Sequence, residues 1–129
     1  MKLLCMDYGD KRIGFAMGDT EQNIAFPREV MEGRAKALDY VSRMIDHEGV
    51  QKVIVGIPLR HSGEEGALAD DIRAFAHEIT EKLGVDIEFQ NEILSTKAIQ
   101  KGTVPKAKID AASAALILQS YLDRILITK

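Results

Sequence analysis

The sequence has one cysteine, Cys5, among its 129 residues. A single cysteine excludes both a disulfide framework and a cysteine-rich zinc site, so the fold must rest on its hydrophobic core. A chain of this length buries roughly two-thirds of the surface that its unfolded form exposes. Because domains usually hold about 100–200 residues, we expect one domain spanning residues 1–129.

Long hydrophobic runs and aromatic residues are also scarce. No stretch approaches the roughly 18 apolar residues of a membrane span. The apolar run near the N-terminus is short and charged residues follow it at once, which is unlike a signal peptide. We therefore expect a cytoplasmic protein that does not bind membranes. Aromatic residues make up only 5% of the chain, which argues against a platform for stacking bases.

The net charge of −3 argues against a general nucleic-acid binder, which is usually basic. The distribution of charge matters more than the sum. Between Glu92 and Asp110 the chain has no acidic residue and four lysines, namely Lys97, Lys101, Lys106 and Lys108. This basic stretch is either a phosphate-contacting segment or an ordinary solvated loop, and charge alone does not separate the two.

The hydrophobic pattern predicts a mixed α/β fold. Three short apolar runs separated by turn residues predict an antiparallel meander, with Pro27 either weakening its third strand or placing it at an edge. The period then changes to that of helices alternating with strands, which predicts right-handed parallel crossovers. The expected elements are strands at 3–6, 13–17 and 24–30, a helix at 37–45, a strand at 53–55, a helix at 67–83, a strand at 85–89, a short helix at 95–101 and a last, largely buried helix at 109–125.

Three carboxylates stand out by their positions. Asp7 ends the first strand, Glu92 follows the last strand, and Asp110 opens the last helix. Each has an ordinary structural explanation. Asp7 suits a turn, Glu92 suits the first turn of a helix, and Asp110 suits an N-cap that accepts from the Ser113 amide.

The same three acids also suit a metal site. Neighbouring strand ends converge in such a sheet, so Asp7 and Glu92 are able to face each other with Asp110 beside them. Clustered carboxylates raise one another's pKa unless a cation neutralises them. Hard oxygen ligands favour Mg²⁺ or Mn²⁺. Two such ions about 3.5–4 Å apart would hold the attacking and leaving oxygens of a phosphodiester.

Four separated motifs resemble the YqgF/RuvX family of Holliday-junction resolvase-like proteins and pre-16S rRNA nucleases. They occur in the family's order and span essentially the whole chain. The matching segments are Asp7-Tyr8-Gly9-Asp10-Lys11-Arg12-Ile13-Gly14, Val55-Gly56-Ile57-Pro58-Leu59 followed by Gly63-Glu64-Glu65-Gly66, Glu92-Ile93-Leu94-Ser95-Thr96, and Ile109-Asp110-Ala111-Ala112 followed by Leu116 to Leu122.

The resemblance implies an RNase H-like fold, a five-stranded mixed sheet of order 3-2-1-4-5 with its first three strands antiparallel and helices on both faces. It implies that Asp7, Glu92 and Asp110 bind Mg²⁺ or Mn²⁺, with two ions, and catalyse phosphodiester hydrolysis. The expected substrate is precursor 16S rRNA, Holliday-junction-like DNA, or both. The phosphate-contacting residues would be Lys11, Arg12, Arg60, Lys97, Lys101, Lys106 and Lys108.

The chain also departs from the family pattern. Asn91-Glu92-Ile93 replaces the usual Asp-Glu-Arg, which removes a planar arginine donor suited to phosphate. The segment between Glu92 and Asp110 is shorter than is usual, and Arg60 stands where the family often has Asn. An alternative is therefore a nucleic-acid-binding module without catalysis. A nucleotide-phosphate binder related to actin-like ATPases is a third hypothesis, and a homodimer is left open.

Overall fold

The computed structural model describes residues 1–9, 11–58, 66–91 and 106–127, and within the last range it describes side chains from residue 111 onward. These ranges hold five strands and three helices. In chain order they are β1 (Lys2–Tyr8), β2 (Arg12–Asp19), β3 (Ile24–Glu32), α1 (Arg34–Glu48), β4 (Val50–Ile57), α2 (Ala67–Leu83), β5 (Asp86–Asn91) and α3 (Lys106–Ile127).

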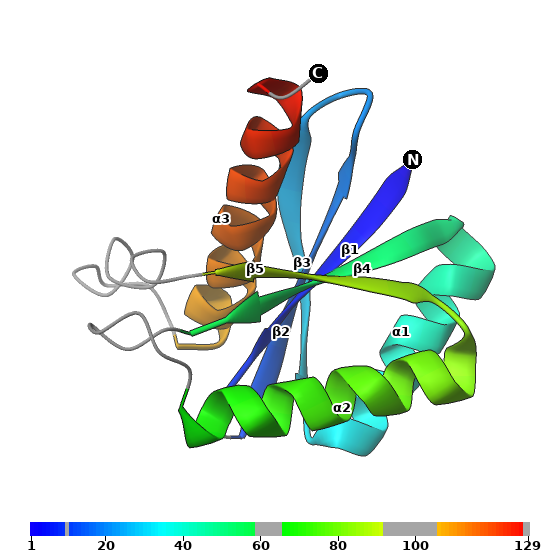
Figure 1. Cartoon of the computed structure of the whole chain (residues 1–129), viewed down its shortest axis with the longest axis vertical. Coiled ribbons are helices and arrows are strands. Elements are labelled where there is room, and N and C mark those ends of the chain that lie inside the picture. The colour runs from blue at the N-terminus through cyan, green and yellow to red at the C-terminus, as the bar shows by residue number, and fades with distance from the viewer. Residues whose placement is uncertain (10, 59–65, 92–105, 128–129) are drawn as a thin grey trace.

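The strands form one sheet in the order β3-β2-β1-β4-β5, which confirms the predicted topology (Figure 1). β1 and β2 pair antiparallel, as do β2 and β3, because tight turns connect them. β1 pairs parallel with β4, and β4 with β5, because α1 and α2 carry the chain back across the sheet between those strands. Pro27 lies in the edge strand β3, where a missing N–H is tolerated.

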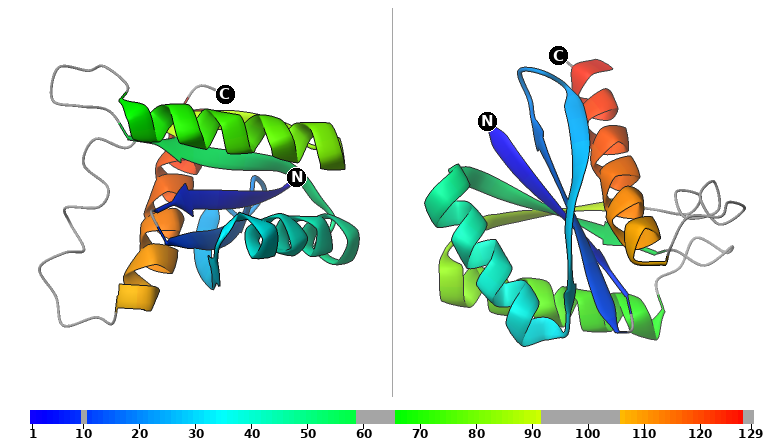
Figure 2. Two further views of the ribbon diagram at one scale, coloured as in Figure 1. Left: turned by 90° about the horizontal axis from the view of Figure 1, so that it is seen from below. Right: turned by 180° about the vertical axis from the view of Figure 1, so that it is seen from behind.

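Helices cover both faces of the sheet, with α1 and α2 on one side and α3 on the other (Figure 2). Alternate residues of a strand face opposite sides. In β1, Leu4 and Met6 therefore pack in the core under α1 and α2, whereas Leu3 and Cys5 pack with α3. All four side chains are fully buried, so β1 is the central strand of both cores.

α2 has the predicted bounds, whereas α1 extends three residues beyond the predicted helix at each end and α3 starts early. α1 and α2 end at Gly49 and Gly84, as expected. α3 begins at Lys106, three residues before the predicted start, since Lys-Ala-Lys continues the helix with residues of high helix propensity. No helix in the described ranges is long and apolar enough to cross a membrane. The predicted short helix at 95–101 lies outside the described residues.

A close approach between β2 and α3 fixes how the helix sits on the sheet. A Cβ atom on Gly18 would lie 3.0 Å from Leu118 Cδ2, 3.1 Å from the Ile24 carbonyl oxygen and 3.2 Å from Leu122 Cδ1. Two leucine side chains and a backbone carbonyl thus occupy the space that any other residue would need. Glycine at this position lets α3 pack directly against the sheet.

We predict that Gly18→Ala lowers the free energy of unfolding by about 1–3 kcal/mol, since overpacking forces the leucines or the backbone to shift. Urea unfolding followed by circular dichroism measures the effect. Lys36→Ala, an exposed change on α1, serves as the control and should alter stability by less than about 0.5 kcal/mol. Wild-type stability in Gly18→Ala would show that α3 is free to move away from β2.

Candidate active site

The carboxyl ends of three parallel strands define one edge of the sheet. β1 ends at Tyr8, β4 at Ile57 and β5 at Asn91, and because these strands run in the same direction their ends lie together. The first turns of α3 lie on the same side of the molecule (Figures 1 and 2). Open α/β sheets usually bind ligands outside the carboxyl ends of their strands.

Asp7 occupies the central place at this edge. It is half-buried and is paired in register with Gly14 of β2. The alternation along β1 puts Asp7 on the same face as Leu3 and Cys5, which is the face that α3 covers. The carboxylate therefore belongs to the end of a strand whose central residues, Leu3 to Met6, are fully buried, rather than to a solvated turn.

The other two predicted acids are described less completely. Asp110 lies inside α3, five residues into the helix, so the interpretation as an N-cap residue is wrong. The reason is the earlier start of the helix at Lys106. Glu92 directly follows β5 but lies outside the described residues, so its place is known only through its neighbour Asn91.

Of the predicted phosphate contacts, Lys11 and Arg12 lie at the edge that carries Asp7. Lys11 is exposed in the turn between β1 and β2, and Arg12 begins β2. Lys106 and Lys108 lie in the first turns of α3, although their side chains are not among those described. Arg60, Lys97 and Lys101 fall outside the described residues.

A tight turn holds Lys11 and Arg12 beside the end of β1. The Gly9 N–H donates to the Arg12 carbonyl oxygen over 2.9 Å. A Cβ on Gly9 would lie 2.7 Å from that same oxygen, closer than real atoms approach. Glycine is therefore required for the turn, and the turn fixes two basic residues within five positions of Asp7.

Arg34 contacts Tyr8, the residue after Asp7, and this contact was not predicted from the sequence. Its Nε donates to the Tyr8 hydroxyl over 2.9 Å and a second nitrogen donates to the Asp71 carbonyl over 3.3 Å. The guanidinium also lies 5.6 Å from the centre of the Tyr8 ring and 5.5 Å from that of Phe75. The hydrogen bond to Tyr8 raises the pKa of Arg34. One side chain thus joins the ends of β1, α1 and α2.

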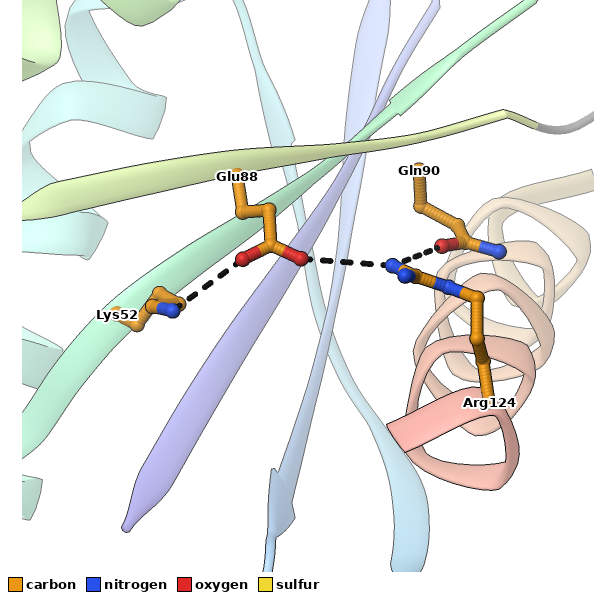
Figure 3. Close-up of polar contacts among 4 residues, drawn as sticks. All are labelled: Lys52, Glu88, Gln90 and Arg124. Carbon is orange, nitrogen blue, oxygen red and sulfur yellow. Dashed lines mark hydrogen bonds and ion pairs between the residues drawn. The ribbon is translucent and has the colours of Figure 1, made fainter. Parts of the chain in front are cut away.

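A second polar network ties β5 to α3 (Figure 3). Glu88 accepts from Lys52 Nζ over 3.3 Å and from Arg124 over 3.4 Å, and Arg124 also donates to Gln90 over 3.1 Å. Burial is the largest single influence on the pKa of Lys52 and lowers it, but the bond to Glu88 and the negative charge around the amine together leave that pKa raised. The interactions of Lys52 therefore stabilise the fold at any pH below the ordinary pKa of lysine. This contribution is lost as the pH rises through the raised pKa of Lys52 in the folded protein.

This network lies on the α3 face of β4 and β5, and it steadies the two elements that lead to the predicted acids. Gln90 lies two residues before Glu92, and Arg124 projects from the helix that contains Asp110. In the sequence, the polar residues at alternate positions 86, 88 and 90 indicate that one face of this strand is not covered by the apolar core. Their partner on α3 was not foreseeable, because it depends on how the helix crosses the sheet.

The donor chemistry near the strand ends suits a hard cation, although the described residues alone contain no group of three metal-ligating side chains. Asp7 supplies one carboxylate there. Ser113, one helical turn after Asp110 in α3, is 1% exposed, and its Oγ has no hydrogen-bond partner among the described atoms. A buried hydroxyl without a partner is costly and calls for an explanation.

Comparison with known proteins settles the family. The family model described as "RuvX: Holliday junction resolvase" matches residues 1–124. The chain belongs to the RuvX family. It is 34% identical to a Chloroflexus aurantiacus protein named "Putative pre-16S rRNA nuclease", over 94% of this chain and 86% of that one. The four sequence motifs therefore identified the family correctly.

Solved structures confirm the RNase H-like fold of the resolvases. RuvC from Thermus thermophilus matches with a TM-score of 0.62 at 14% identity, covering 97% of this chain and 96% of that one. Fowlpox virus resolvase, solved in complex with Holliday-junction DNA, matches with a TM-score of 0.58 at 15% identity, covering 98% and 99%. At these identities the likeness concerns the fold of the RuvX chain and not its substrate.

We predict that Glu88→Gln lowers the free energy of unfolding by about 1 kcal/mol, because two partly exposed ion pairs are each worth about 0.2–1 kcal/mol. Urea unfolding at 20 mM and at 1 M NaCl tests this, since salt screens such pairs. The matched control is Glu81→Gln on α2, which pairs only with an exposed histidine among the described residues. An equal loss at both salt concentrations would contradict an electrostatic origin.

Proposed function

We propose that this RuvX protein is a divalent-metal-dependent endonuclease acting on structured nucleic acid, and that residues 1–129 form one nuclease domain. The 5′ maturation of precursor 16S rRNA is the favoured reaction, with cleavage of branched DNA as a second substrate class. The observation that carries the proposal is Asp7, half-buried at the end of the central strand in a chain whose family match spans residues 1–124. The names of the curated relatives support the assignment to RNA.

Asp7, Glu92 and Asp110 would hold Mg²⁺ or Mn²⁺. Three observations support this site. Asp7 lies near the carboxyl end of β1, β5 ends one residue before Glu92, and α3 contains Asp110. When bound, two such ions lower the pKa of water and neutralise charge on the leaving 3′ oxygen. The protein's own task would be to fix the three carboxylates, and the buried residues of β1 and the Glu88–Arg124 link support that role.

The phosphate backbone would be bound by basic residues around this edge. Lys11 and Arg12 are held next to β1 by the Gly9 turn, and the lysine-rich stretch leads into α3. The remaining members of the proposed set are Arg60, Lys97, Lys101, Lys106 and Lys108. Local positive charge of this kind binds nucleic acid despite a net charge of −3, because phosphate contacts act at short range in salt.

A second candidate function is binding without cleavage. It is favoured by one specific feature, the replacement of the usual Asp-Glu-Arg by Asn91-Glu92-Ile93, in which the exposed Asn91 ends β5. Losing the arginine removes a bidentate phosphate donor beside Glu92. This alternative predicts salt-dependent binding with no product at any Mg²⁺ or Mn²⁺ concentration. A cytoplasmic location belongs to the proposal in either case, and it is compatible with both a monomer and a homodimer.

We predict that Asp7→Asn, Glu92→Gln and Asp110→Asn each reduce cleavage at least about a hundredfold, since a lost ligand disrupts a site that needs all three acids. The assay compares a 5′-extended 16S rRNA fragment, a four-way DNA junction and linear duplex, each with Mg²⁺ and with Mn²⁺. The variants should keep wild-type circular dichroism, because each replacement preserves side-chain volume and removes a like charge.

The matched control is Asp39→Asn, on the exposed surface of α1, where the carboxylate pairs with Arg43 at 3.1 Å. It should cleave like wild type. Full activity in one acid variant would remove that residue from the metal site. Tight, salt-sensitive binding by wild type without any cleavage would replace the nuclease with the binding module.

A further inference from the structure

The two edge strands of the sheet, β3 and β5, differ in whether other groups occupy the outer backbone hydrogen-bonding positions. At β3, the Gln119 side chain of α3 takes the place of a neighbouring strand: its amide nitrogen donates to the Asn23 carbonyl over 2.9 Å, and its oxygen accepts from the Ala25 N–H over 3.0 Å. Pro27 lies in the same strand and lacks an N–H. Devices of this kind protect an edge from pairing with another chain.

The opposite edge, β5, has no such protection in the described part of the chain. β5 pairs only with β4, and none of the hydrogen bonds there joins its outer side to another described residue. Its four inner residues are half-buried and its two end residues are exposed. The backbone of a six-residue strand is thus presented along one side.

A groove runs beside this edge, between β5 and α2. Its volume is about 470 Å³, and its walls are Arg73, Ala76, His77 and Thr80 of α2 and Asp86, Ile87 and Phe89 of β5. The helix residues follow the spacing of one helical stripe. Ile87 and Phe89 are two positions apart, so both face the groove at the spacing of alternate residues in an extended chain.

The α2 wall of the groove is basic at one end. The Arg73 guanidinium lies 4.5 Å from the centre of the Phe89 ring, which holds its charge at the carboxyl end of β5. The lining also has an apolar part, made by Ala76 of α2 and Ile87 of β5. At the other end the Thr80 hydroxyl donates to the Val85 carbonyl over 3.4 Å and closes the turn from α2 to β5.

We propose that this groove, which we call the β5–α2 groove, binds an extended segment of a partner protein as a sixth strand. Main-chain hydrogen bonds to β5 would supply affinity, and alternate side chains would supply specificity. The segment carries an acidic side chain that meets Arg73 and apolar side chains two and four residues away that cover Ile87 and Ala76. The proposal is independent of the nuclease activity.

The charge of α2 favours a strand of a partner protein over a nucleic acid or a second copy of this chain. The helix carries Asp70, Asp71, Glu78 and Glu81 against the cations Arg73 and Lys82, so a phosphate backbone laid along it is repelled. A second copy of this chain would bring another acid-rich α2, so like charges would face each other. A single strand with one acidic residue opposite Arg73 avoids both repulsions.

The test uses two capped heptapeptides, Thr-Glu-Thr-Val-Thr-Val-Thr and the reversed order, with the full chain labelled with ¹⁵N. We expect one of them to shift the amide resonances of residues 86–91 in a saturable manner. Replacing the threonine between the two valines of that peptide by proline should abolish the shifts, since strand addition needs its N–H. No saturable shift with either peptide would overturn the proposal.

Charge reversal tests the specificity. Arg73→Glu should weaken the tighter peptide about tenfold, and changing the peptide's Glu to Lys should restore binding to that variant. Arg43→Glu is the matched control, because Arg43 also lies on a helix over an aromatic ring, 5.5 Å from Tyr40. Equal weakening by both variants would contradict the assigned contact. Concentration-dependent shifts of residues 86–91 without peptide would show that a second copy is the occupant instead.

Discussion

Parallel pairing of β1, β4 and β5 is the constraint on which the rest of the molecule depends. The pairing aligns the carboxyl ends of three strands at one edge, and it requires α1 and α2 to cross on the opposite face from α3. β1 lies at the centre with Leu3 to Met6 fully buried, so the backbone that leads to Asp7 cannot shift without disturbing both cores. A carboxylate at that point is held by the whole fold.

Polar contacts then fix the elements around this edge to one another. Arg34 joins Tyr8 to the start of α1 and to α2, and Glu88 with Arg124 joins β5 to α3. Each contact is weak by itself, because the groups are partly exposed. These contacts matter because they fix the relative positions of the elements, and a metal site requires its ligands to be positioned by supporting interactions. The fold, the family and the place of Asp7 thus support the same proposed chemistry.

Much of this was predictable from the sequence. The antiparallel meander, the crossover direction and the glycine ends of α1 and α2 follow from local patterns, whereas the strand order came from the resemblance of four motifs to the RuvX family. The start of α3 was missed because Lys106 to Lys108 suit a helix and a solvated loop equally well. The Arg34–Tyr8 bond and the Gln119 cap on β3 join residues 26 and 94 or more positions apart, and no periodic pattern encodes such contacts.

The central claim is that Asp7, Glu92 and Asp110 converge on one cation site. Thermal unfolding of the wild type, with and without Mn²⁺, tests it most directly, since a ligand that binds only the folded state raises the melting temperature. The account predicts a rise of several degrees for the wild type and for Asp39→Asn, and none for Asp7→Asn, Glu92→Gln or Asp110→Asn. An undiminished rise in Asp7→Asn would contradict it, because the ion would then bind away from the central strand.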